Sequence, residues 1–345
     1  MSKRKKNIGI GLLISMVVLL VLSAVVYHFV FSPSVNNLAE KSTYLYIEKN
    51  DSYEDVFSQV SQKKITQNLK TFDYVSKVLS YKTHIKPGRY TLKPNMNIWK
   101  LVRLLRSGRQ DEIKFTIKSY WQLEQFINYA TERINIDTYH LTSLLNDEIF
   151  LTKNKIKKEE WMAYLIPETH HFYWNTSETE LMDKLIKYHQ KFWNEERKAS
   201  AKEINLSPME VSILASIVQK ETSKVDEMPS VAGLYINRLN CGMKLQADPT
   251  VIFSLNDASI KRVYQKQTLV ASAYNTYMIT GLPPGPICVP SIVAIDAVLN
   301  KRDHNYLFMC AKEDFSGYHN FAVTYTEHQK NAKRYTNALN KRNIK

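Results

Sequence analysis

The longest apolar run in the chain lies close to its N-terminus. From Asn7 to Phe31, 25 residues pass without an Asp, Glu, Lys or Arg. As a helix this run would span about 37 Å, against about 30 Å for the hydrocarbon core of a bilayer. A cleaved signal peptide would have a shorter apolar region of about 7–15 residues and a small-residue cleavage site, and we find no convincing A-x-A motif before Ser32. The pattern favours an uncleaved transmembrane helix over residues 7–31.

The residues on either side of this run predict its orientation. Four consecutive basic residues, from Lys3 to Lys6, precede the apolar run. By the positive-inside rule they keep a basic tail, residues 1–6, in the cytoplasm. Residues 32–41 are polar, contain Pro33 and indicate a linker. We therefore expect a single-pass protein of the cell (inner) membrane, with everything beyond about residue 33 extracytoplasmic (periplasmic).

Residues 42–112 show the pattern of a small α+β module. A strand-like alternation is followed by capping residues and amphipathic stretches, and Gly108 stops the last of these. We expect a strand at 43–48, helices at 53–61 and 66–81, a strand at 89–92 and a short helix after Asn97. The module resembles the LysM-like modules that precede some cell-wall enzymes, above all in its GRYTL and SG segments. A spacer between the membrane and the rest of the chain is an equally good interpretation.

Residues 113–345 predict one larger, mainly helical domain with short strands, so the fold class is α+β. Helical patterns cover residues 120–133, 138–145 and 178–193. The last begins with a capping box, Ser177 with Glu180.

One further helix carries a carboxylate on its apolar side. Ser207, Pro208 and Glu210 form a strong helix start, and Glu221 lies seven residues after Leu214 on the apolar stripe. Burial of a carboxylate raises its pKa, and a raised pKa is what a general acid for glycosidic cleavage needs at neutral pH. The alternative is a frayed helix end at which Glu221 pairs with a neighbour such as Lys224.

The remaining polar residues give weaker indications of a functional site. Asp248 precedes a Pro and an apolar run, as a helix N-cap does, and no second carboxylate stands out as a nucleophile or base. Tyr274 and Asn275 lie beside a stiff, proline-rich loop that suits either carbohydrate binding or a structural turn. His319 and His328 are too sparse for a metal site, and no cofactor motif is present.

The composition of the chain limits the classes of molecule that it is expected to bind. The chain has 47 Lys and Arg against 33 Asp and Glu, a formal net charge of +14. An extracytoplasmic basic domain suits anionic lipid or acidic wall polymers, and its location removes most of the case for nucleic acid. The three cysteines, Cys241, Cys288 and Cys310, are too few and too scattered for a disulfide framework, so we expect isolated buried thiols.

Several long motifs in order resemble the YceG-like family of membrane-anchored endolytic murein transglycosylases. They are LASIVQKET at 214–222, VAGLYINRL at 231–239, GMKLQADPT at 242–250, YNTY at 274–277, GLPPGPI at 281–287 and HNF at 319–321. The resemblance implies that Glu221 is the catalytic residue. It implies a substrate groove lined by Gln246, Asp248, Tyr274, Asn275, Tyr277 and His319, with no cofactor and no metal.

The chain also departs from the family pattern. Many members have a second Glu at the position of Gln219, so the resemblance places the acid at Glu221 alone. In the segment at 161–169, Met162 and Ala163 replace a Glu and a Gly, and Glu168 replaces an Asp or Asn, which makes a substrate-binding role for this stretch less certain.

The chemistry that the resemblance implies is cleavage of nascent peptidoglycan at the bond from N-acetylmuramic acid to N-acetylglucosamine. The sugar's own 6-hydroxyl attacks, leaving a 1,6-anhydro end, and peptidoglycan synthases are the expected protein partners. Two alternatives stay open: a hydrolytic muramidase, and a non-catalytic scaffold of the wall or the division machinery.

Overall fold

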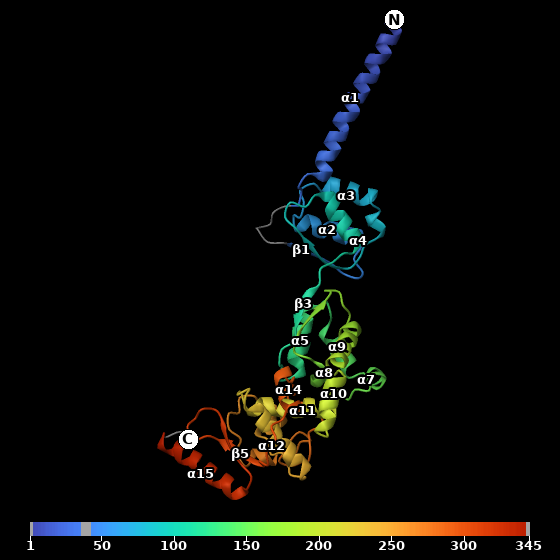
Figure 1. The fold of residues 1–345 in the computed structure, drawn as a ribbon. Helices are drawn as coiled ribbons and strands as arrows, with labels where there is room; N and C mark the ends of the chain where they lie inside the picture. Colours follow the sequence, from blue (N-terminus) through green and yellow to red (C-terminus); the bar gives the residue numbers. More distant parts are fainter. Residues whose placement is uncertain (1–2, 36–42, 343–345) are drawn as a thin grey trace. The chain divides into compact units, whose positions relative to one another are not determined.

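The computed structural model describes residues 3–35 and 43–342. The expected linker therefore lies mostly outside the described residues. The fold combines many helices with short strands, and it divides into two compact units. One comprises residues 1–113 and 171–176, and the other comprises residues 114–170 and 177–345. Figure 1 shows their elements in order along the chain.

The first unit begins with a long apolar helix, α1 (Lys3–Phe31). Its segment Ile10–Phe31 has 22 residues and a mean hydropathy of 2.7, so by length and composition it can cross a membrane. Except for Val30, which is buried, the apolar side chains of this segment are exposed on all sides of the helix. A helix that is apolar all round is stable in water only when it is covered, which agrees with a lipid environment.

The rest of the first unit is the small α+β module. Its elements are β1 (Thr43–Ile47), α2 (Tyr53–Gln62), α3 (Leu69–Val78), the 3-10 turn η1 (Tyr81–Thr83), β2 (Gly88–Leu92) and α4 (Ile98–Ser107). β1 and β2 pair antiparallel, with Leu45 opposite Tyr90. Both side chains are fully buried with Phe72 and Leu101. Gly108 ends α4 at a φ of 72°, a left-handed conformation that glycine adopts without strain.

Two features of this module differ from the prediction. The helix expected at 66–81 is shorter, because Ser80 takes a left-handed φ of 52° and the chain turns into η1. In addition, residues 171–176 return to this unit from far along the chain. The Gln110 side chain donates to Asn175 at 2.8 Å, and Asn175 donates to the Pro87 carbonyl at 3.3 Å. The sequence around Asn175 contains no pattern that predicts its contacts with Gln110 and Pro87.

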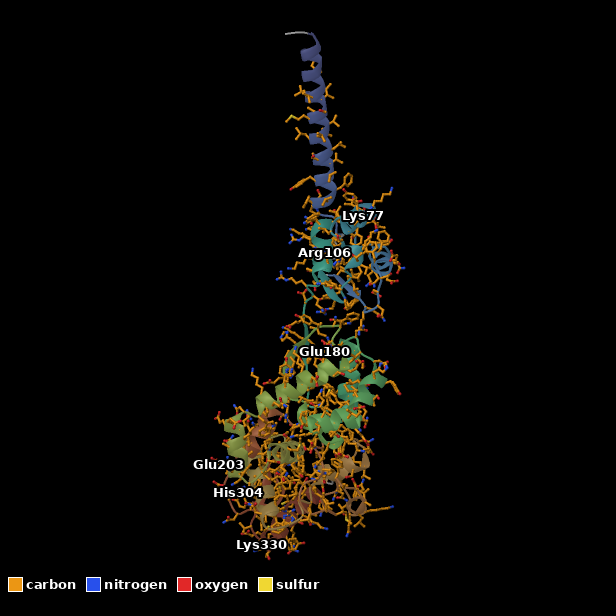
Figure 2. The ribbon with its side chains drawn as sticks, turned by 90° about the vertical axis from the view of Figure 1, so that its right-hand side faces the viewer. Lys77, Arg106, Glu180, Glu203, His304 and Lys330 are labelled. Atoms are coloured by element: carbon orange, nitrogen blue, oxygen red, sulfur yellow. The ribbon has the colours of Figure 1, made fainter. Side chains whose placement is uncertain are left out.

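The second unit is mainly helical, as expected. Its elements are α5 (Leu123–Arg133), α6 (Thr138–Leu145), α7 (Glu148–Asn154), η2 (Lys158–Glu160), α8 (Trp161–Tyr164), α9 (Glu178–Phe192), α10 (Glu195–Glu203), α11 (Pro208–Glu221), α12 (Met228–Asn240), α13 (Asp248–Leu255), η3 (Gln267–Leu269), α14 (Ile292–Leu299), β5 (Phe308–Ala311), β6 (His319–Ala322) and α15 (Tyr325–Lys341). Two further strands, β3 (Ile113–Thr116) and β4 (Thr169–Phe172), each include residues of both units. β3 and β4 form one two-stranded sheet, and β5 and β6 form another. The side chains in Figure 2 include Glu180, in the first turn of α9.

Helix α11 is the centre of this unit. Ser207 caps it, Pro208 begins it and Glu210 completes the predicted capping box. The sequence indicated one apolar stripe, but the structure buries every residue from Val211 to Val218. The reason is that α12, α13 and α14 all pack against it. A core helix of this kind is held on all sides, so the position of its last residue is fixed by the fold.

Candidate active site around Glu221

Glu221 is the last residue of α11, and its carboxylate faces α12. The helix ends there because Thr222 is extended, with φ −138° and ψ 140°. Tyr235 of α12 donates its hydroxyl to Oε1 of Glu221 at 2.6 Å. The alternative of a frayed end paired with Lys224 is not what the structure shows, because the Lys224 ammonium lies over the ring of Tyr318. Glu221 is thus held by a buried tyrosine at the edge of the core.

A cavity of about 240 Å³ opens in front of this carboxylate. Its walls come from the end of α11, one side of α12, the start of α13, and β5 and β6. The lining residues are Glu221, Leu234, Tyr235, Arg238, Leu245, Gln246, Asp248, Tyr277, Met309, Cys310, Ala311 and His319. A larger depression, of about 640 Å³, lies near Glu210 and the proline-rich loop. Glu210 is already engaged in its capping box. The smaller cavity is therefore the better candidate for the active site, because Glu221, Asp248 and His319 line it.

The surroundings of Glu221 raise its pKa. Burial is the main cause and brings the pKa from the ordinary 4.5 to about 7. The Tyr235 hydrogen bond opposes this shift, the negative charge of Asp248 adds to it, and the positive charge of Arg238 opposes it. Near neutral pH this carboxyl is therefore partly protonated, as a proton donor must be.

Asp248 is the second carboxylate at the cavity. The sequence pattern predicted an N-cap here, and this is wrong: Ala247 is the N-cap residue, and Asp248 is the first residue of α13. Its Oδ1 accepts a hydrogen bond from the hydroxyl of Tyr277 at 2.6 Å. Burial raises the pKa of Asp248, and the Tyr277 hydrogen bond opposes that rise. The expectation that no second carboxylate would stand out is therefore corrected.

A buried guanidinium supports the same cavity wall. Arg238 is only 7% exposed and donates to the main-chain carbonyls of Leu307 and Leu245, both at 2.7 Å. Its contact with the side-chain oxygen of Gln246 is longer, at 3.4 Å. Among the described residues Arg238 has no carboxylate partner within ion-pair distance. Its charge is available to the cavity.

His319 reaches the cavity with its ring orientation set by Glu227. Nδ1 of His319 lies 2.9 Å from Oε2 of Glu227, and the His319 main-chain N–H donates to Oε1 at 2.7 Å. Thr222, next to Glu221, also donates to Oε2 at 2.9 Å. Glu227 is 5% exposed. This buried carboxylate accepts a hydrogen bond from Nδ1 of His319 and leaves the other ring nitrogen for the cavity.

Comparison with known proteins identifies the family of the chain. The model of the YceG-like family matches residues 45–334. The chain belongs to the YceG-like family. A relative in Bacillus subtilis, named endolytic murein transglycosylase, is 28% identical over 316 residues, which cover 86% of this chain and 85% of the relative. A Streptococcus pneumoniae protein of the same name is 23% identical over 322 residues, 85% of this chain but 58% of that protein.

A solved structure shows the same fold. The crystal structure of a yceG-like protein from Listeria monocytogenes superposes with a TM-score of 0.56 at 24% identity, over 85% of this chain and 99% of that one. The chain therefore shares its fold with that yceG-like protein.

Two residues that the family resemblance pointed to lie elsewhere. Asn275 is fully buried, and its amide donates to the carbonyls of Thr268 and Val270 at 2.9 and 2.7 Å. Tyr274 packs against Phe253 with ring centroids 4.8 Å apart. Neither lines the cavity, whereas Gln246, Asp248, Tyr277 and His319 do. Asn275 and Tyr274 instead stabilise the loop that contains them.

The departures from the family pattern have structural explanations. The Gln219 amide donates to Ser119 Oγ at 2.6 Å and accepts from the Ser291 N–H at 2.6 Å, so it uses both donor and acceptor. It does not line the cavity. Met162 and Ala163 belong to α8 and are buried in the core, while Glu168 is exposed. The first two substitutions therefore affect packing.

Sequence reasoning missed Tyr235, Arg238 and Glu227. Tyr235 and Arg238 lie three residues apart in a largely apolar helix, so both share one face. That spacing was a usable signal. No comparable signal joins Glu227 to His319, which lie 92 residues apart.

The cysteines differ in part from expectation. All three are free, but only Cys288 is buried, whereas Cys241 is exposed and Cys310 is intermediate. In the part of the chain that the structure describes, no group of three or more His, Cys, Asp or Glu side chains could hold a metal ion.

Proposed function

We propose that this protein is an endolytic lytic transglycosylase that cleaves peptidoglycan strands between N-acetylmuramic acid and N-acetylglucosamine. The observation that carries the proposal is Glu221, a half-buried carboxyl at the wall of a polar cavity, which accepts a hydrogen bond from Tyr235 at 2.6 Å and has its pKa raised to about 7. The names of the relatives support the same activity. Cleavage within nascent strands would end their elongation.

Glu221 can perform both proton transfers. In the first step its carboxyl gives a proton to the glycosidic oxygen, and the bond from that oxygen to the anomeric carbon of the muramic acid breaks. In the second step the 6-hydroxyl of the same sugar attacks that carbon, and its proton returns to the Glu221 carboxylate. The product is a 1,6-anhydro ring, no water is consumed, and the acid is regenerated.

The neighbouring side chains divide the remaining work. We assign substrate contact to Gln246, Tyr277 and His319, because they line the cavity and carry polar atoms at its surface. An ionised Asp248 would stabilise the positive charge that develops at the anomeric carbon. It also keeps the Glu221 carboxyl protonated by repulsion. Tyr274 and Asn275 act through the loop that they hold.

We further propose the topology and the role of the first unit. The basic residues Lys3 to Lys6, in the first turns of α1, support a cytoplasmic N-terminus, with residues 32–41 as the linker and residues 42–112 and 113–345 outside the cell (inner) membrane. The small module is proposed to act as a LysM-like glycan-binding module. An anchored enzyme of this kind would meet strands as synthases release them.

The deciding experiment is digestion of uncross-linked glycan strands, read by mass spectrometry. The wild-type chain should release fragments with 1,6-anhydro ends, and Glu221→Gln should release none, since an amide cannot donate the proton. Glu210→Gln is the matched control, because it makes the same change on the same helix at the capping box. Fragment release by Glu221→Gln would exclude Glu221 as the acid. If the wild-type chain released no fragments, the enzyme proposal would fail and the non-catalytic scaffold would remain as the interpretation.

The presence of Asp248 at the cavity also favours a second candidate, a hydrolytic muramidase. A second carboxylate can activate water or form a covalent intermediate. The same digestion separates the two reactions, because hydrolysis gives products heavier by one water, with reducing ends. Reducing ends in the wild-type digest would replace the lyase proposal with this one.

A further inference from the structure

A groove on the small module is lined by basic side chains without ionic partners. It has a volume of about 530 Å³, and Lys93, Lys100, Arg103 and Arg109 contribute to its wall, with Asp111 as its one lining carboxylate. All four basic side chains are exposed. Among the described residues none of them lies within ion-pair distance of a carboxylate. Their charge is therefore available to a ligand.

The charge collects on one side of α4 because this helix is amphipathic. Its apolar residues, among them Leu101 and Leu105, are buried in the module core, so the basic residues are on the opposite side. A neighbouring depression of about 400 Å³ shares Arg103 and adds Lys86 and Arg106. Arg106 is labelled in Figure 2, on the surface of the module. The two depressions form one positive surface, which we call the α4 basic face.

The groove begins where the apolar helix α1 ends. The side-chain amide of Asn97, just before α4, donates to the Phe31 carbonyl at 3.2 Å. The rings of Phe31 and Trp99 are 5.6 Å apart, and those of Tyr27 and Phe31 are 5.1 Å apart. Aromatic side chains of this kind gather at the level of lipid headgroups. Since Trp99 marks that level, Lys100 beside it lies at headgroup depth.

We propose that the α4 basic face binds the phosphates of anionic phospholipid headgroups. This rests on the proposed membrane anchor and is independent of the catalytic cavity. Residues three apart on a helix have Cβ atoms about 5–6 Å apart, so the Cβ atoms of Lys100 and Arg103 differ in depth by no more than that, inside the Debye length of about 8 Å. Such contacts would fix the orientation of the small module on the membrane surface.

The test uses the full chain in lipid nanodiscs and measures lysine acylation by mass spectrometry. One set of discs is pure phosphatidylcholine and the other contains about one third phosphatidylglycerol. We expect Lys93 and Lys100 to react several-fold more slowly in the anionic discs and to recover at high salt. Lys261, an exposed lysine of the second unit, should react equally in both. A third arm adds free glycerol phosphate to the neutral discs and should protect neither lysine.

Variants test whether the groove acts as a unit. Arg103→Gln with Arg109→Gln should reduce the protection of Lys93, since each neutralised cation weakens attraction to an anionic surface about fivefold. Lys191→Gln, at an exposed position on α9 of the second unit, is the matched control and should leave the protection intact. Equal acylation in both discs would overturn the proposal. Protection by free glycerol phosphate would overturn the assignment of the ligand as a lipid. Loss of the chain from all discs would overturn the proposed membrane anchor, on which this inference rests.

Discussion

Removal of the Tyr235 hydroxyl should raise the pKa of Glu221 further. The hydroxyl donates to the carboxylate at 2.6 Å and stabilises its ionised form against a burial that already brings the pKa to about 7. A hydrogen bond to a charged group is worth about 1.5–3 kcal/mol, and one pKa unit corresponds to about 1.36 kcal/mol. Tyr235→Phe should therefore raise the pKa by about one to two units.

The measurement is the pH dependence of kcat/KM for release of glycan fragments. Glu221 must be protonated to act as the acid, so activity falls as the pH rises through its pKa. In the wild type this alkaline limb is expected near pH 7, and in Tyr235→Phe it should lie about one to two pH units higher. The variant loses one oxygen atom from the core and keeps its ring, so folding should be retained.

Tyr277→Phe is the matched control, since its hydroxyl donates to Asp248 at 2.6 Å and not to Glu221. Without that hydrogen bond Asp248 is more readily protonated, and its repulsion of the Glu221 charge can only decrease. The alkaline limb should then stay near pH 7 or move lower. An unmoved limb in Tyr235→Phe, or an equal rise in both variants, would refute the assignment of Glu221 as the acid tuned by Tyr235.

Three further outcomes are expected. Glu221→Gln should stabilise the fold at pH 8 by about 3 kcal/mol and leave its stability unchanged at pH 4. The reason is that a folded-state pKa raised from 4.5 to about 7 destabilises the wild type only as the pH rises through that interval. Thermal melts of both proteins at the two pH values test this. Gln219→Glu should not restore glycan release to Glu221→Gln, because the side chain at 219 contacts Ser119 outside the cavity; restored fragments in the digest would contradict the assignment. Glu227→Gln should lower kcat/KM about 10- to 100-fold by weakening the hydrogen bond that orients His319, and unchanged kinetics would exclude that role.

Local signals in the sequence predicted many of the elements correctly. The helix starting after Ser52 and the helix ending at Gly108 were both expected, and so were the capping boxes at Ser177 and Ser207. These succeed because a cap or a left-handed glycine acts within three or four residues of itself. The same limit explains the error at Asp248, where the Asp-Pro pattern suggested an N-cap but the side chain bonds to Tyr277 instead.

The sequence by itself determined the apolar N-terminal helix, the order of the family motifs and the carboxylate at the end of a core helix. Only the tertiary structure decided what that carboxylate meets. Tyr235, Asp248 and the pair of Glu227 with His319 arrive from separate elements, and Asn275 turns inward to satisfy buried carbonyls. The physical reason is that burial, charge and hydrogen bonding set the pKa of Glu221, and all three depend on distances between residues far apart in the chain.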